Sequence, residues 1–121
     1  MSTQTGSATT PITSANEVRL LGRVVAEPAA VELPSGDELV TFRISVDRPA
    51  GVSTARQKVD SVPCCAWTAR ARRSAVTWRA GDVVEVSGAV RCRFFQTVRG
   101  LGSRVEVEVA SARIIRQAPD A

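Results

Sequence analysis

The sequence contains no histidine, so it offers neither a His-based catalytic arrangement nor a credible set of metal ligands. No nucleophile, base and orienting group can be assembled from the other residues, and we therefore predict no enzyme, no bound metal and no other cofactor. Three cysteines, an odd number, give no disulfide framework. We interpret Cys64, Cys65 and Cys92 as small buried apolar groups.

Long hydrophobic runs are also missing. No apolar stretch approaches the roughly 18 residues that cross a membrane, so no membrane partner is predicted. Residues 1–15 carry no charged side chain and no apolar block, which excludes a secretory signal. We expect a flexible leader over 1–15, one domain over 16–115 and a short tail over 116–121, in a cytoplasmic protein.

Acidic residues are scarce in the middle of the chain. Between Arg48 and Arg104 there are eleven basic and three acidic residues, whereas the rest of the chain has five basic and nine acidic residues. All but one of the basic residues are arginine, whose guanidinium suits bidentate phosphate contacts. This distribution favours a polyanionic partner.

Apolar and polar residues alternate through most of the chain, which predicts strands. We expect strands over 16–26, 30–33, 40–47, 58–68, 82–95 and 104–115, and a single helix over 69–79. Residues 48–57 and 96–103 are predicted to form loops between them. A helix between the third and fourth long strands is typical of an all-β, five-stranded OB-fold barrel.

The two faces of the strand over 82–95 differ in character. The apolar face is predicted to be core and consists of Val84, Val86, Val90, Cys92 and Phe94. The opposite face carries Arg91, Arg93 and Phe95, which suits a surface that contacts phosphates and stacks a base. A solvated strand face is the competing interpretation.

Only five aromatic residues occur in the chain. Phe42 and Phe94 follow the apolar alternation, and Trp78 lies on the helix side that would cap a barrel, so all three are predicted to be core. Trp67 and Phe95 lie on the opposite faces of their strands. We interpret these two rings as base-stacking platforms, with subunit contact as the rival use of Phe95.

Four segments, in order and with little gapping, resemble the bacterial single-stranded DNA-binding protein family over about Asn16 to Ile115. They are residues 16–24, 41–48, 67–81 and 88–93. The resemblance implies an OB-fold over which single-stranded DNA wraps with little sequence preference. It also implies a homo-oligomer, a tetramer or a dimer, formed in part through the first strand, and a location at the nucleoid.

Mapped onto this sequence, the family's aromatic positions match Trp67 and Phe95, while two others fall on Ser61 and near Ala50. Arg91 and Arg93 match basic positions of the family. The predicted DNA-binding residues are therefore Arg48, Arg56, Lys58, Trp67, Arg91, Arg93, Phe95 and Arg104.

The family's main replicative members end in an acidic tip with an aromatic anchor, whereas residues 116–121 contain one carboxylate side chain and no ring. The resemblance thus implies no tail-mediated recruitment of proteins and an auxiliary paralogue in replication, recombination or repair. Two alternatives stay open. One is an OB-fold protein-interaction module related to primosome factors, with weak DNA binding, and the other is an RNA-binding protein.

Overall fold

The computed structural model describes residues 13–49 and 56–119. Its elements, in chain order, are β1 (Val18–Val24), β2 (Ala29–Glu32), β3 (Glu38–Asp47), β4 (Val59–Ala66), α1 (Ala69–Ala75), β5 (Val83–Thr97) and β6 (Gly100–Arg116). Residues 1–12 of the predicted leader, residues 50–55 of the predicted loop and the last two residues of the predicted tail lie outside this description.

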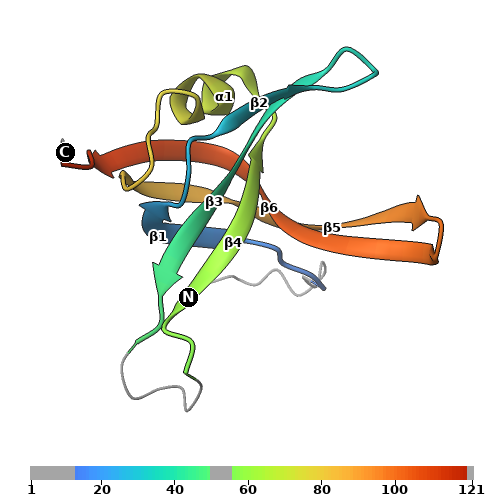
Figure 1. The fold of residues 1–121 in the computed structure, drawn as a ribbon, viewed down its shortest axis with the longest axis horizontal. Coiled ribbons are helices and arrows are strands. Elements are labelled where there is room, and N and C mark those ends of the chain that lie inside the picture. Colours follow the sequence, from blue (N-terminus) through green and yellow to red (C-terminus); the bar gives the residue numbers. More distant parts are fainter. Residues whose placement is uncertain (1–12, 50–55, 120–121) are drawn as a thin grey trace.

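The strands close into a five-stranded barrel, as predicted. They pair in the order β1, β5, β6, β4, β3, and β3 pairs back to β1 through Arg23↔Ser45 and Val24↔Ile44. The contact between β4 and β6 is parallel, and β2 extends the sheet as a further strand beside β3. Helix α1 lies between the third and fourth barrel strands and packs across one end of the barrel (Figure 1).

The barrel interior is filled by the apolar face of each strand, because alternate side chains point to opposite sides of a sheet. Ile44, Val84 and Val86 are almost completely buried. Trp78 is 3% exposed and meets Phe42 edge to face, with ring centroids 5.2 Å apart. The predictions that Phe42 and Trp78 belong to the core are confirmed.

Two of the three cysteines are buried as predicted. Burial is the main reason that the pKa of the Cys64 thiol rises to about 12 and that of Cys65 to about 11. Both thiols are therefore protonated at neutral pH. The prediction for Cys92 is wrong, because this side chain is exposed.

The helix is shorter than predicted. It begins after the N-cap Thr68, whose hydroxyl accepts from the Ala71 N–H, and ends at Ala75 instead of residue 79. The β-branched Val76 and Thr77 follow, and β-branched side chains lower helix propensity. Gly81 adopts a φ of +92° in the turn before β5, a backbone conformation that favours glycine.

Strands β5 and β6 continue beyond the barrel as a two-stranded ribbon, which reaches out to one side in Figure 1. β1 pairs with β5 only as far as Gly88, and β4 pairs with β6 only from Val107 onwards. The ribbon occupies most of the predicted loop over 96–103 and turns at residues 98–99.

This ribbon overturns the prediction that Phe94 is core, because its side chain is 72% exposed. The alternation identified its face correctly, but the neighbouring barrel strands stop before they reach it. Phe94 and Cys92 therefore lie on an apolar strand face that no described strand covers.

Gly88 lies where the β5–β6 register shifts and is the last residue of β5 that pairs with β1. A Cβ at this position would collide with the carbonyl oxygen of Glu108 and lie 3.1 Å from the Cα of Val109. Because backbone atoms cannot move aside as a side chain can, we expect Gly88→Ala to lower the free energy of unfolding by about 1–3 kcal/mol. Chemical denaturation measures this. Ser87→Ala, one residue away, is the control, and equal stability of both variants would contradict the close approach.

Candidate nucleic-acid interface

The outer face of β4, β5 and β6 brings together residues that lie far apart in the sequence. The odd-numbered positions of β5 point outward there, so Arg91 and Arg93 stand beside Arg104 of β6, which pairs directly with Arg93. Trp67, just after β4, lies beside them. A groove of about 540 Å³ is lined in part by Trp67, Arg93 and Arg104, three of the predicted binding residues.

Trp67 is only partly exposed. The guanidinium of Arg93 lies 5.7 Å from the centroid of its ring, a cation–π distance. Its indole N–H is buried and makes no hydrogen bond within the described residues. The backbone carbonyl of Trp67 accepts from Arg72 of α1 at 2.6 Å, which ties the end of β4 to the helix.

Phe95 lies further out on the ribbon, on the same strand face as Arg91 and Arg93. Its side chain is 45% exposed. The ring lies across Gly102 of β6, where an added Cβ would come within 2.5 Å of a ring carbon. Gly102 therefore leaves room for the ring to lie close to the strand, with its outward side open to solvent.

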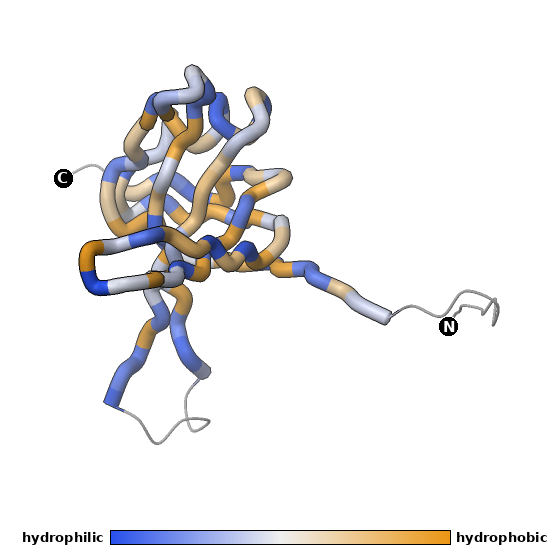
Figure 2. The backbone as a smooth tube through the Cα atoms, turned by 90° about the vertical axis from the view of Figure 1, so that its right-hand side faces the viewer, coloured by the Kyte–Doolittle hydropathy of each residue, from blue (hydrophilic) through white to orange (hydrophobic). Residues whose placement is uncertain are grey.

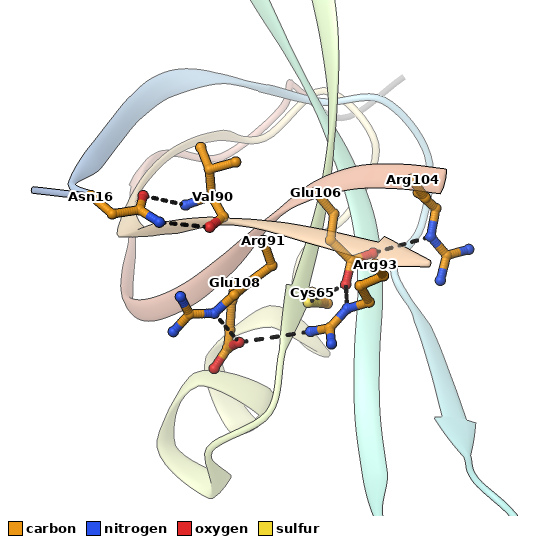
Figure 3. Close-up of polar contacts among 8 residues, drawn as sticks. All are labelled: Asn16, Cys65, Val90, Arg91, Arg93, Arg104, Glu106 and Glu108. Carbon is orange, nitrogen blue, oxygen red and sulfur yellow. Dashed lines mark hydrogen bonds and ion pairs between the residues drawn. The ribbon is translucent and has the colours of Figure 1, made fainter. Parts of the chain in front are cut away.

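Two carboxylates of β6, those of Glu106 and Glu108, form ion pairs with the arginines of this face (Figure 3). Arg91 Nε lies 2.9 Å from Glu108 Oε1, and Arg93 Nε lies 2.6 Å from Glu106 Oε2. Arg104 Nε approaches the other oxygen of Glu106 at 3.5 Å. The predicted phosphate ligands of the barrel are thus already ion-paired within the chain.

Glu106 is the centre of this network, and its side chain is 11% exposed. Its Oε2 also accepts from the buried Cys65 thiol at 3.1 Å. Burial acts to raise the pKa of Glu106, but the hydrogen bonds from Arg93 and Cys65 act against it, and the pKa is lowered overall. Glu106 is therefore a carboxylate at neutral pH.

The three remaining predicted cations lie apart from this face, on the arms that lead into and out of residues 50–55. These arms project away from the barrel and are largely hydrophilic (Figure 2). Arg48 makes a bidentate contact with Asp60, at 2.7 and 3.0 Å, and these hydrogen bonds hold the pKa of that carboxyl below its usual range. Arg56 and Lys58 are exposed.

Arg43 on β3 is a groove residue that the sequence predictions did not include. Its guanidinium donates to the hydroxyl and the carbonyl of Ser61 at 2.9 and 3.0 Å. An arginine therefore lies against Ser61, the residue onto which the family resemblance maps one of the aromatic positions. The alternation over 40–47 already placed Arg43 on the outer face, but it did not show that this face belongs to the groove.

A closed five-stranded barrel with one helix between its third and fourth strands is the architecture of the OB-fold class. The sequence pattern of the Single-strand binding protein family matches residues 15–116. The chain belongs to this family.

Single-stranded DNA-binding protein 3 of Listeria innocua is 30% identical over 81 residues, which cover 67% of this chain but only 51% of that protein. The chain thus spans about half the length of this relative. Single-stranded DNA-binding protein B of Bacillus subtilis is 26% identical over 105 residues, covering 86% of this chain and 93% of that protein.

Among solved structures, the Plasmodium falciparum SSB complex with ssDNA matches with a TM-score of 0.62 and 22% identity. The match covers 88% of this chain and 98% of that chain, and it supports the OB-fold. Over residues 13–49 and 56–119, no helix is long and apolar enough to cross a membrane, and no group of His, Cys, Asp and Glu could hold a metal ion.

Proposed function

We propose that this protein binds single-stranded DNA with little sequence preference and without catalysis. Trp67 and Phe95 stack bases on the outer face of the barrel and ribbon. Arg91, Arg93 and Arg104 contact the phosphate backbone of the DNA beside these rings. Arg48, Arg56 and Lys58, on the arms, contact further phosphates of the same strand. Membership of the single-strand binding protein family carries this proposal, supported by the groove that joins Trp67 to Arg93.

The chemistry of this face suits a single strand better than a duplex. Unpaired bases offer flat faces to rings, and every base has such a face, so stacking on aromatics tolerates any sequence. Guanidiniums attract backbone phosphates, which are the same in every nucleotide. The described binding residues therefore offer general affinity rather than recognition of particular base edges.

The direct test is a titration of a fluorescent oligothymidine at two salt concentrations. We expect tight binding at low salt that weakens steeply at high salt, because each phosphate contact releases counterions. Matched RNA and duplex competitors show whether the preference is for single-stranded DNA. Absent or merely micromolar binding at low salt would contradict the proposal.

A protein-interaction module is the second candidate function, and the ribbon gives it a specific basis. Phe94, Leu101 and Val105 are exposed apolar side chains of β5 and β6 that no other described strand covers. Ser61, onto which the resemblance maps one of the family's aromatic positions, cannot stack a base, and this also favours a protein-interaction module. A partner recovered with the full chain that survives nuclease treatment would support this function, and recovery that depends on nucleic acid would support DNA binding.

We also propose that the protein forms a homo-oligomer, as the family resemblance implies, with the face of β1 as a contact surface. Leu21 on this strand is half exposed, whereas Arg19 already pairs with Glu85 within the chain. Leu21 is therefore the better candidate for a contact between subunits. Mass measurement in solution distinguishes tetramer, dimer and monomer. Nucleoid association in the cytoplasm and an auxiliary role remain predictions.

A further inference from the structure

The carboxylates of β6 reach the arginines of β5 because of the strand register. Arg91 lies directly opposite Glu106, and Arg93 lies directly opposite Arg104. Each arginine, however, pairs with the carboxylate one step along the diagonal, Arg91 with Glu108 and Arg93 with Glu106. Diagonal neighbours on one face of an antiparallel pair are within reach of long side chains. Both ion pairs therefore follow from the β5–β6 register, where the ribbon leaves the barrel.

Arg93 links the two carboxylates. Its Nε contacts Glu106 at 2.6 Å, and its Nη2 lies 3.7 Å from Glu108. The same guanidinium lies over the ring of Trp67. A base that stacks on the covered side of this ring has to move Arg93, and a phosphate that binds Arg93 competes with Glu106 and Glu108 for its guanidinium.

We propose that Glu106 and Glu108 act as an acidic clamp, which competes with nucleic-acid phosphates for Arg91 and Arg93 and holds Arg93 over Trp67 in the free protein. This inference rests on the proposed binding of single-stranded DNA. The incoming strand exchanges carboxylate for phosphate around the guanidiniums and uncovers the indole. The clamp therefore sets the affinity of the site lower than its arginine content alone would give.

The clamp has a consequence for salt dependence. When phosphate replaces the carboxylates, Glu106 and Glu108 lose their partners and attract cations from solution. This uptake offsets part of the counterion release that DNA binding produces. The affinity of the wild-type protein should consequently depend less on salt than the number of arginine–phosphate contacts predicts.

The experiment compares Glu106→Gln, Glu108→Gln and the double variant with wild type in the oligothymidine titration. Glutamine retains an oxygen acceptor for Arg93 and Cys65 but not the charge. An exposed ion pair is weak, so its loss when phosphate replaces the carboxylate costs little binding free energy. We therefore expect about threefold tighter binding for each single variant and about tenfold for the double variant. The slope of log affinity against log salt should steepen with each carboxylate removed, by less than the roughly 0.7 that one phosphate contact contributes.

Glu85→Gln is the matched control. Glu85 also pairs with two arginines, Arg19 and Arg113, but it lies six residues before Arg91 on β5, about 20 Å along the strand. Its loss changes the net charge by the same amount as each single variant. It should leave both affinity and salt slope close to wild type.

If Glu106→Gln and Glu108→Gln bind no more tightly than Glu85→Gln and show the same salt slope, the carboxylates only brace the ribbon and the clamp is wrong. Glu108→Gln alone decides this if Glu106→Gln does not fold, because Glu108 makes no contact with Cys65 among those described. Failure of every protein to bind at low salt would overturn the proposed function itself.

Discussion

Replacing Trp67 and Phe95 together by alanine should weaken binding of single-stranded DNA by about 2–6 kcal/mol, because each base–ring stack contributes roughly 1–3 kcal/mol. These rings are the two base-stacking platforms of the proposed binding mode. The loss should appear equally in DNA of different sequence and persist at high salt, since stacking does not depend on counterion release. Fluorescence titration with oligothymidine and a mixed-sequence oligomer measures it.

Phe94→Ala is the control for this pair. Phe94 neighbours Phe95 on β5 but points to the other side of the ribbon, and it is the more exposed of the two rings. Its removal should leave DNA affinity within about twofold of wild type, because the phosphate and stacking groups lie on the opposite face. If Phe94→Ala bound DNA more weakly than Phe95→Ala, the DNA-binding surface would lie on the Phe94 side of the ribbon and the proposed surface would be wrong.

Trp78→Ala should lower the free energy of unfolding by about 3–5 kcal/mol, the usual cost of truncating a large buried ring. Trp78 packs against Phe42 between α1 and the barrel, and its loss opens a cavity where the helix meets the core. For a small domain this is a large share of the total stability. Denaturant unfolding followed by far-ultraviolet circular dichroism measures the change.

Trp78→Phe is the milder comparison, since it keeps an aromatic ring against Phe42 and should cost much less stability. It also leaves Trp67 as the only indole, because the chain has two tryptophans. Its fluorescence would then report directly on the groove during DNA binding. A Trp78→Ala protein as stable as wild type would contradict the core position of this side chain.

The elements that the sequence predicted best are those packed on the barrel. The alternation over 40–47 corresponds to β3, and that over 84–90 to the inner part of β5. Val40, Phe42 and Ile44 of β3 and Val84 and Val86 of β5 are buried as the pattern predicts, because a half-buried strand needs one apolar and one polar face. Val90, which was also predicted to be core, is only half-buried. Phe42 was assigned correctly for the same reason, whereas Trp78 was assigned to the core from the side of the predicted helix that caps the barrel.

The predictions failed where the strands leave the barrel. Alternation tells which residues share a face, but not whether another element covers that face. Phe94 and Cys92 continue the apolar face of Val84 and Val86, yet they lie beyond the last residues that pair with β1 and β4. Whether such a face is core depends on the lengths of neighbouring strands, which local sequence does not encode.

The candidate site was predicted in part. Arg91, Arg93 and Phe95 share a face by the strand period alone, and the family resemblance added Trp67. Glu106 and Glu108, however, lie just beyond the basic segment from Arg48 to Arg104, so the charge distribution along the chain did not connect them with these arginines. Pairing of β5 with β6 places these carboxylates against the arginines.

By itself, the sequence determined the barrel, its single helix and the residues that face inward, because these follow from the periods of strands and helices and from the burial of apolar side chains. Only the tertiary structure decided how the outer face is used. Ion pairing and ring coverage depend on cross-strand register and on contacts such as Arg93 with Trp67, which are 26 residues apart in the chain. Such contacts arise when separate strands meet, so no local pattern specifies them.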